Sequence, residues 1–122
     1  MRKIKFLFFI VNLLLFGGLV AQTNPVDVGK AYIQTNFEEL NLKLADVDQM
    51  ILTDHYTSKH NGATHLFFQQ SHRDIAVFNA TINLTIDKKG KIFVTGNRFV
   101  EDLGSKIEKS DSAFYYSDRA QH

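Results

Sequence analysis

Three evenly spaced histidines are the residues that first suggest chemistry in this chain. His55, His60 and His65 lie five positions apart, and the imidazole nitrogen is a common zinc ligand. On a helix this spacing would scatter the side chains around the axis. On a hairpin it places one before the turn, one at its tip and one after it. We therefore interpret these histidines as surface and turn residues, and we expect no metal site.

Asp54, His55 and Ser58 have the residue types of a hydrolytic triad. They fall on one predicted strand, where neighbouring side chains point to opposite faces, so they do not converge. The chain contains no His-Glu-x-x-His sequence and no glycine-rich phosphate loop. We predict that the chain is not an enzyme and has no catalytic residue, no metal ligand and no bound cofactor.

The first 21 residues have the layout of a secretory signal peptide. Arg2, Lys3 and Lys5 precede an apolar run over residues 6–16, and Ala21 offers a small residue for cleavage. The run is shorter than the roughly 20 residues that span a bilayer, which argues against the alternative of an N-terminal anchor. A lipoprotein anchor is excluded because the chain has no cysteine. We predict a secreted protein without a stable membrane anchor.

The remaining 101 residues are enough for one domain. They carry 11 basic and 13 acidic residues, a formal charge of −2, so no basic surface favours binding to nucleic acid. Without cysteines, an exported domain has to be held together by an apolar core. We predict a domain over residues 22–103, followed by a polar tail over 104–122 that is mobile or truncated.

The domain begins with one amphipathic helix, predicted over residues 25–40. Asn24 suits the N-cap and Pro25 the first helical position. Four segments with strand composition follow, at residues 50–58, 63–71, 75–86 and 91–99. Turns this short join antiparallel neighbours. The predicted fold is therefore α+β, with one helix packed on a four-stranded antiparallel meander.

Register arithmetic predicts which strand residues face the helix. If Arg73 and Asp74 are the two turn residues, His72 pairs with Ile75 and Phe67 lies opposite Ala80. The predicted core face then holds Phe67, Phe78, Ile82, Ile92 and Val94. The other face collects Leu66, Phe68, Val77 and Phe93. An apolar patch of this kind commonly has a partner, so we predict that these four residues form a docking surface.

Several strand and turn signatures recur in the order of a known family. They are a Gly-x-Thr-His strand ending in Gln-Gln, an Ile-x-Val-x-Asn-Ala strand and an Asp-x-x-Gly-Lys turn. The positions concerned are Gly62, Thr64, His65, Gln69, Gln70, Ile75, Val77, Asn79, Ala80 and Gly90. In this, the chain resembles the fungalysin/thermolysin propeptide motif of secreted zinc metallopeptidases. One departure is that Arg73-Asp74 stands where the family usually has glycine before the isoleucine.

The resemblance implies a propeptide that helps a metallopeptidase fold and holds it inactive until cleavage. Zinc would then belong to the catalytic domain, which is absent from this chain, and that domain would be the partner in cis or in trans. The chain would be either a fragment of a longer precursor or a free-standing protein. Two alternatives stay open. One is a stand-alone secreted inhibitor or binding module, similar in layout to cystatin-like or PepSY-like domains, and the other is an exported structural domain with no enzyme partner.

Overall fold

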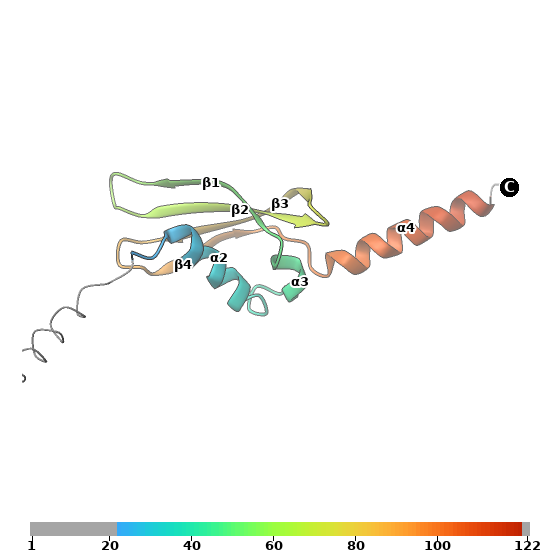
Figure 1. The fold of residues 1–122 in the computed structure, drawn as a ribbon, viewed down its shortest axis with the longest axis horizontal. Helices are drawn as coiled ribbons and strands as arrows, with labels where there is room; N and C mark the ends of the chain where they lie inside the picture. Colours follow the sequence, from blue (N-terminus) through green and yellow to red (C-terminus); the bar gives the residue numbers. More distant parts are fainter. Residues whose placement is uncertain (1–21, 121–122) are drawn as a thin grey trace, which may run out of the picture.

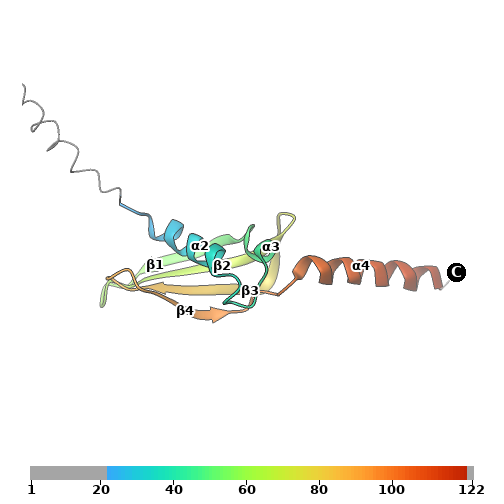
Figure 2. The same ribbon diagram turned by 90° about the horizontal axis from the view of Figure 1, so that it is seen from below.

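The computed structural model describes residues 22–120, so the predicted signal peptide lies outside the described residues. Its elements are α2 (Pro25–Thr35), α3 (Leu44–Val47), β1 (Ile51–Thr57), β2 (Thr64–His72), β3 (Ile75–Ile86), β4 (Ile92–Asn97) and α4 (Leu103–Ala120). The four strands form one antiparallel sheet in the order β1-β2-β3-β4. The predicted α+β layout is confirmed, with α2 lying across one face of the sheet (Figures 1 and 2).

Helix α2 begins where the sequence predicted and ends earlier. The Val26 N–H donates to the Asn24 side chain at 3.0 Å, and Pro25 occupies the start of the helix. The helix ends at Thr35, and the chain continues in turns to Asn41, whose φ is +58°. The predicted end at residue 40 was therefore wrong, because the apolar spacing persists through turns that are no longer α-helical.

The core lies between α2, α3 and the sheet. Its buried members are Ile33, Leu42, Val47, Met50, Leu66, Phe68, Ile82, Leu84, Ile86 and Phe99. Ile92 and Val94 pair with Ile86 and Leu84 and pack against this core, as the sequence predicted. At Gly29 the helix backbone comes so close to the sheet that a β-carbon would collide with the Leu66 side chain. Glycine is therefore needed there for close approach.

A bulge in β3 changes the predicted register. The pairing of β2 with β3 shifts between Gln69 and Ser71, so Gln70 lies opposite residues 77–80. Within that bulge Asn79 has a φ of +59°, in the left-handed region that non-glycine residues seldom adopt. The predicted pairing of His72 with Ile75 is present, but it does not propagate along the strands.

The bulge exchanges the two faces of β2 relative to the prediction. Phe67 pairs with Asn83 rather than with Ala80. As a result Leu66 and Phe68 point into the core, with 0% and 1% of their surface exposed, while Phe67 lies half-buried on the outer face. The prediction that Leu66 and Phe68 lie on the outer face was wrong, because one shift in register exchanges every side chain between faces.

The tight turn between β2 and β3 carries backbone strain. Arg73 and Asp74 have φ angles of +49° and +63°, the pattern of a type I′ turn, which favours Asn-Gly. We expect Asp74→Gly to raise the free energy of unfolding by about 0.5–1 kcal/mol, because glycine adopts this conformation without steric cost. Urea unfolding followed by circular dichroism measures the change.

Gly90→Ala is the matched control for that prediction. Gly90 has a φ of +87° and open space around its α-carbon, so a methyl group there meets no neighbour. The substitution should therefore lower stability through the backbone alone. Equal stability of Asp74→Gly and the wild type would show that this turn is unstrained.

Residues beyond the sheet form a helix where the sequence predicted only a polar tail. Helix α4 starts at Leu103 beside the end of β4 and extends away from the sheet (Figures 1 and 2). The β2–β3 hairpin lies at the same end of the sheet as the start of α4 (Figure 1). Within residues 22–120, no helix combines the length and apolar character needed to cross a bilayer.

Candidate docking surface

The four residues predicted to dock a partner occupy three different environments. Leu66 and Phe68 belong to the core. Val77 is half-buried in the β3 bulge, near the start of α4. Phe93 lies on the outer face with 43% of its surface exposed. The structure therefore does not bring these four residues together.

Aromatic side chains on the outer face contact one another. The Tyr56 ring stacks on His65, with centroids 4.7 Å apart, and on Phe67 at 6.1 Å. His65 Nδ1 lies 3.1 Å from the Thr85 hydroxyl, within hydrogen-bonding distance. The Lys91 ammonium lies 5.1 Å from the centre of the Phe93 ring. Each of these rings already has a neighbour within the domain.

Among residues 22–112, the most exposed large apolar side chains lie elsewhere, where β3 begins. Phe78 is 88% exposed and Ile75 is 72% exposed. Ile75 also lines an open pocket of about 280 Å³ between the β2–β3 hairpin and the first turns of α4. Its lining residues are His72, Arg73, Ile75, Val77, Ile107 and Asp111. We call Ile75, Val77, Phe78 and Ile107 the hairpin-end patch. The prediction that Phe78 lies on the core face was wrong, and the sequence did not single out Ile107.

Two buried polar residues, Gln70 and Asp46, fix the segment that leads to α4. The first is Gln70, whose amide is fully buried; its nitrogen donates to the carbonyls of Val100 at 2.9 Å and of Asp46 at 3.3 Å. Its oxygen accepts from the Val100 N–H at 2.8 Å. Each of these hydrogen bonds is made to the backbone, so the Gln70 side chain fixes the path of the chain here.

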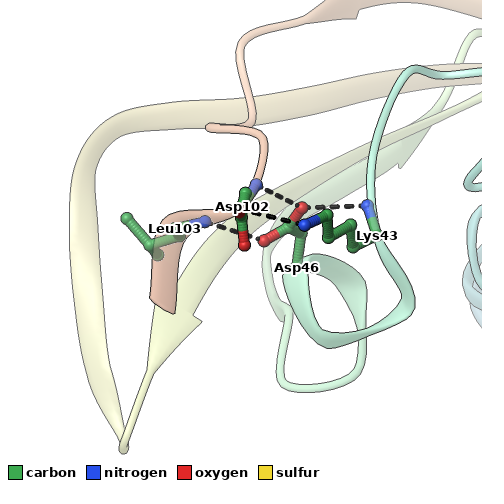
Figure 3. A network of polar contacts seen from close by, with 4 residues as sticks. All are labelled: Lys43, Asp46, Asp102 and Leu103. Carbon is green, nitrogen blue, oxygen red and sulfur yellow. Dashed lines mark hydrogen bonds and ion pairs between the residues drawn. The ribbon is translucent and has the colours of Figure 1, made fainter. Parts of the chain in front are cut away.

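The second is Asp46, which binds the N-terminus of α4 (Figure 3). Its side chain is 4% exposed and accepts from three backbone N–H groups: Lys43 at 2.9 Å, Asp102 at 2.9 Å and Leu103 at 3.1 Å. The first N–H groups of a helix lack partners within the helix, and a carboxylate there also complements the helix dipole. Asp46 therefore joins α3 to α4.

A surface ion pair accompanies this joint. Lys43 Nζ lies 3.0 Å from Asp102 Oδ2, and both side chains remain largely accessible to water. The hydrogen bond from Lys43 lowers the pKa of the Asp102 carboxyl below its usual value, and the same pair raises the pKa of Lys43. The small stabilisation from Asp102 is thus present above its unfolded pKa and is lost as the pH falls through the lower folded value.

The remaining family-motif positions have mainly structural environments. Gly62 and Gly90 have φ angles of +68° and +87° in the two turns at the far end of the sheet. The Thr64 hydroxyl lies 3.0 Å from that of Thr57 across the β1–β2 pair. Gln69 donates to the Val77 carbonyl at 3.0 Å, which helps to hold the β3 bulge, and Ala80 is buried directly after it.

The side chains that suggested chemistry are dispersed. His55 and His60 are exposed on β1 and in the following turn, and His65 lies on β2 beside Tyr56. In the described part of the chain, no group of three or more histidine, aspartate or glutamate side chains could hold a metal ion. The three histidines therefore do not come together at one site in the described residues.

Comparisons with known proteins support the resemblance read from the sequence. Residues 48–99 match the family model described as Fungalysin/Thermolysin Propeptide Motif. The chain is 34% identical over 83 residues to Extracellular metalloproteinase mep of Aspergillus terreus, covering 68% of this chain and 12% of the relative. It is 32% identical over 68 residues to Extracellular metalloproteinase 1 of Phaeosphaeria nodorum, covering 56% of this chain and 11% of the relative.

The chain spans only about a tenth of the length of these relatives. A search of solved structures found no significant match. The family model begins just before β1 and ends after β4, so it covers the whole sheet, including the Gln70 side chain and the β3 bulge. Through residues 48–99, this chain belongs to the family defined by the fungalysin/thermolysin propeptide motif.

Proposed function

We propose that this domain acts as the propeptide of a secreted zinc metallopeptidase. In this role it packs on the catalytic domain, assists its folding and keeps it inactive until the propeptide is removed. Support comes from the family match and from relatives that are named extracellular metalloproteinases. Export agrees with the signal-peptide layout of residues 1–21.

The observation that carries the proposal is the exposure of large apolar side chains on a domain that has a well-packed core. Phe78 and Ile75 are more than two-thirds exposed, although Leu66, Phe68 and Ile82 are almost completely buried. Large apolar side chains that stay exposed beside a packed core commonly mark a protein interface. With a formal charge of only −2 after residue 21, apolar contact rather than long-range attraction would dominate docking.

The proposal assigns the zinc to the peptidase partner. The chain itself would supply a binding surface, and no step of the proposed role requires a metal ion on it. A single chain can act in this way in cis, as part of one precursor, or in trans, as a separate protein. These two arrangements use the same surface and differ in effective concentration.

The test uses the purified chain from residue 22 and the catalytic domain of a fungalysin-type metallopeptidase from the same genome. We expect the chain to inhibit peptide hydrolysis with a Kd on the order of 1 µM or below, and to raise the yield of active enzyme after dilution from denaturant. Hydrolysis is followed with a fluorogenic peptide, and binding by calorimetry.

The two readouts separate the alternatives. Inhibition without an effect on refolding would favour a stand-alone inhibitor over a folding propeptide. Equal hydrolysis and equal refolding yield with and without the chain, together with no heat of binding, would contradict the proposed function. Bovine serum albumin at the same concentration is the control for non-specific protection during refolding.

A further inference from the structure

We infer that the hairpin-end patch, rather than the outer face of the sheet, is the surface that binds the metallopeptidase. The inference rests on the proposed function and specifies where the partner docks. Three members of the patch line the pocket: Ile75 and Val77 at the start of β3, and Ile107 on α4. The fourth is Phe78, which follows Val77 in the strand and is the most exposed of them. Its occupant would be an apolar side chain of the peptidase that enters the pocket between hairpin and helix.

The backbone of β3 directs Phe78 away from the core. In an unbroken strand Phe78 would share a face with Ala80 and Ile82, both of which are buried in the core. The bulge at residues 77–80 breaks this alternation and leaves Phe78 88% exposed. Bulges commonly redirect a side chain next to a functional site. The fold thus places in water a phenylalanine that a regular strand would bury.

The bulge and the exposed Phe78 also lower the stability of the isolated domain. Asn79 adopts a left-handed backbone conformation, which is unfavourable for most residues, although less so for asparagine. The exposure of Phe78 also forgoes the burial of a large apolar side chain. Such features persist where the surrounding structure fixes them, and here Gln69 holds the bulge through the Val77 carbonyl. A partner that covers Phe78 would recover the lost burial.

The outer face of the sheet is less suited to bind the peptidase than the hairpin-end patch. Its rings stack on each other or lie beside a lysine, and Phe67 is half-buried. A partner would gain little additional burial from side chains that are already covered by neighbours. At the hairpin end, by contrast, an apolar centre is bordered by Arg73 and Asp111, which resembles the apolar centre and polar rim of protein interfaces.

The small share of each relative that matches this chain indicates what covers the patch. In the Aspergillus terreus and Phaeosphaeria nodorum metalloproteinases, the matched segment is 12% and 11% of the chain. Most of each relative therefore lies outside the segment and is available to pack against it. The pocket is also lined by α4, which follows the matched residues directly. We therefore assign the patch to the metallopeptidase rather than to a second copy of this chain.

The experiment measures binding of the chain to the same catalytic domain by calorimetry and by inhibition. We expect Phe78→Ser to raise the Kd at least 10-fold and Ile75→Ser to raise it about 5-fold, as for well-buried apolar anchors. Both side chains are exposed in the free domain, so the thermal midpoint should stay within about 2 °C of the wild-type value. Asn79→Gly retains the bulge and should bind like the wild type.

Phe93→Ser and Tyr56→Ser are the matched controls on the outer face. Both are also aromatic and about half exposed, and we expect their Kd values to stay within twofold of the wild type. Wild-type affinity of Phe78→Ser, or a larger loss from Phe93→Ser, would overturn the inference and leave the proposed function intact. No binding by the wild-type chain would overturn both.

Discussion

Phe68→Ser is expected to leave the domain largely unfolded at 25 °C. Phe68 is 1% exposed and packs in the core with Leu66 and Ile82. Truncation of a buried phenylalanine costs about 3–5 kcal/mol, and an unsatisfied buried hydroxyl adds about 1–3 kcal/mol. The total approaches the whole stability of a small domain, roughly 5 kcal/mol or more. Urea titration followed by circular dichroism measures the loss.

Phe67→Ser is the matched control, because it makes the same change one residue away on the opposite face. Phe67 is half-buried and contacts Tyr56 on the outer surface, so we expect a loss of only about 1 kcal/mol. The sequence-based register predicted the reverse order of effects. If Phe67→Ser unfolds the domain and Phe68→Ser does not, then Phe67 belongs to the core and the bulge does not exchange the faces of β2.

Local patterns were sufficient for most elements of the fold. The N-cap at Asn24, the alternation in β3 and the turn glycines placed one helix and four antiparallel strands correctly. The Fungalysin/Thermolysin Propeptide Motif was likewise recognisable from its turn and strand signatures. These features depend on residues that are close together in the chain, where local preferences of the backbone dominate.

The error in the faces came from one non-local feature. Ala76, Phe78 and Ala80 continue the alternation of Ile82 and Leu84, so the sequence reads as a single uninterrupted strand. Asparagine tolerates a left-handed conformation, but nothing in its immediate neighbours requires one. The bulge depends on pairing with β2 across the sheet, and one shift there exchanged Phe67 with Phe68. For the same reason the sequence did not predict the exposure of Phe78, the most exposed large apolar side chain among residues 22–112.

Local sequence patterns also did not predict the contact of Asp46 on α3 with the start of α4. Asp46 and Leu103 are far apart in the chain, and the polar sequence after residue 103 gave no amphipathic signal strong enough to predict α4. In the structure, the buried Asp46 carboxylate accepts from the first N–H groups of α4 and so stabilises the start of that helix. The start of α4 therefore depends on tertiary contact rather than on helix propensity.

Asp46→Ala is expected to lower the free energy of unfolding by about 3 kcal/mol or more. The substitution leaves the N–H groups of Lys43, Asp102 and Leu103 without their shared acceptor, and each buried unsatisfied group costs about 1–3 kcal/mol unless water reaches it. Hydrogen exchange should show the largest loss of protection at residues 102–106, because detachment of α4 relieves two of the three unsatisfied groups.

Lys43→Ala separates the buried carboxylate from the surface ion pair beside it. That substitution removes the contact with Asp102 but leaves the Lys43 backbone N–H on Asp46, so its stability should be close to that of the wild type. Because α4 contributes Ile107 to the hairpin-end patch, Asp46→Ala should also weaken peptidase binding, whereas Lys43→Ala should not. Unchanged exchange at the start of α4 in Asp46→Ala would show that the helix is held by its apolar contacts instead, and the docking surface would then be independent of this carboxylate.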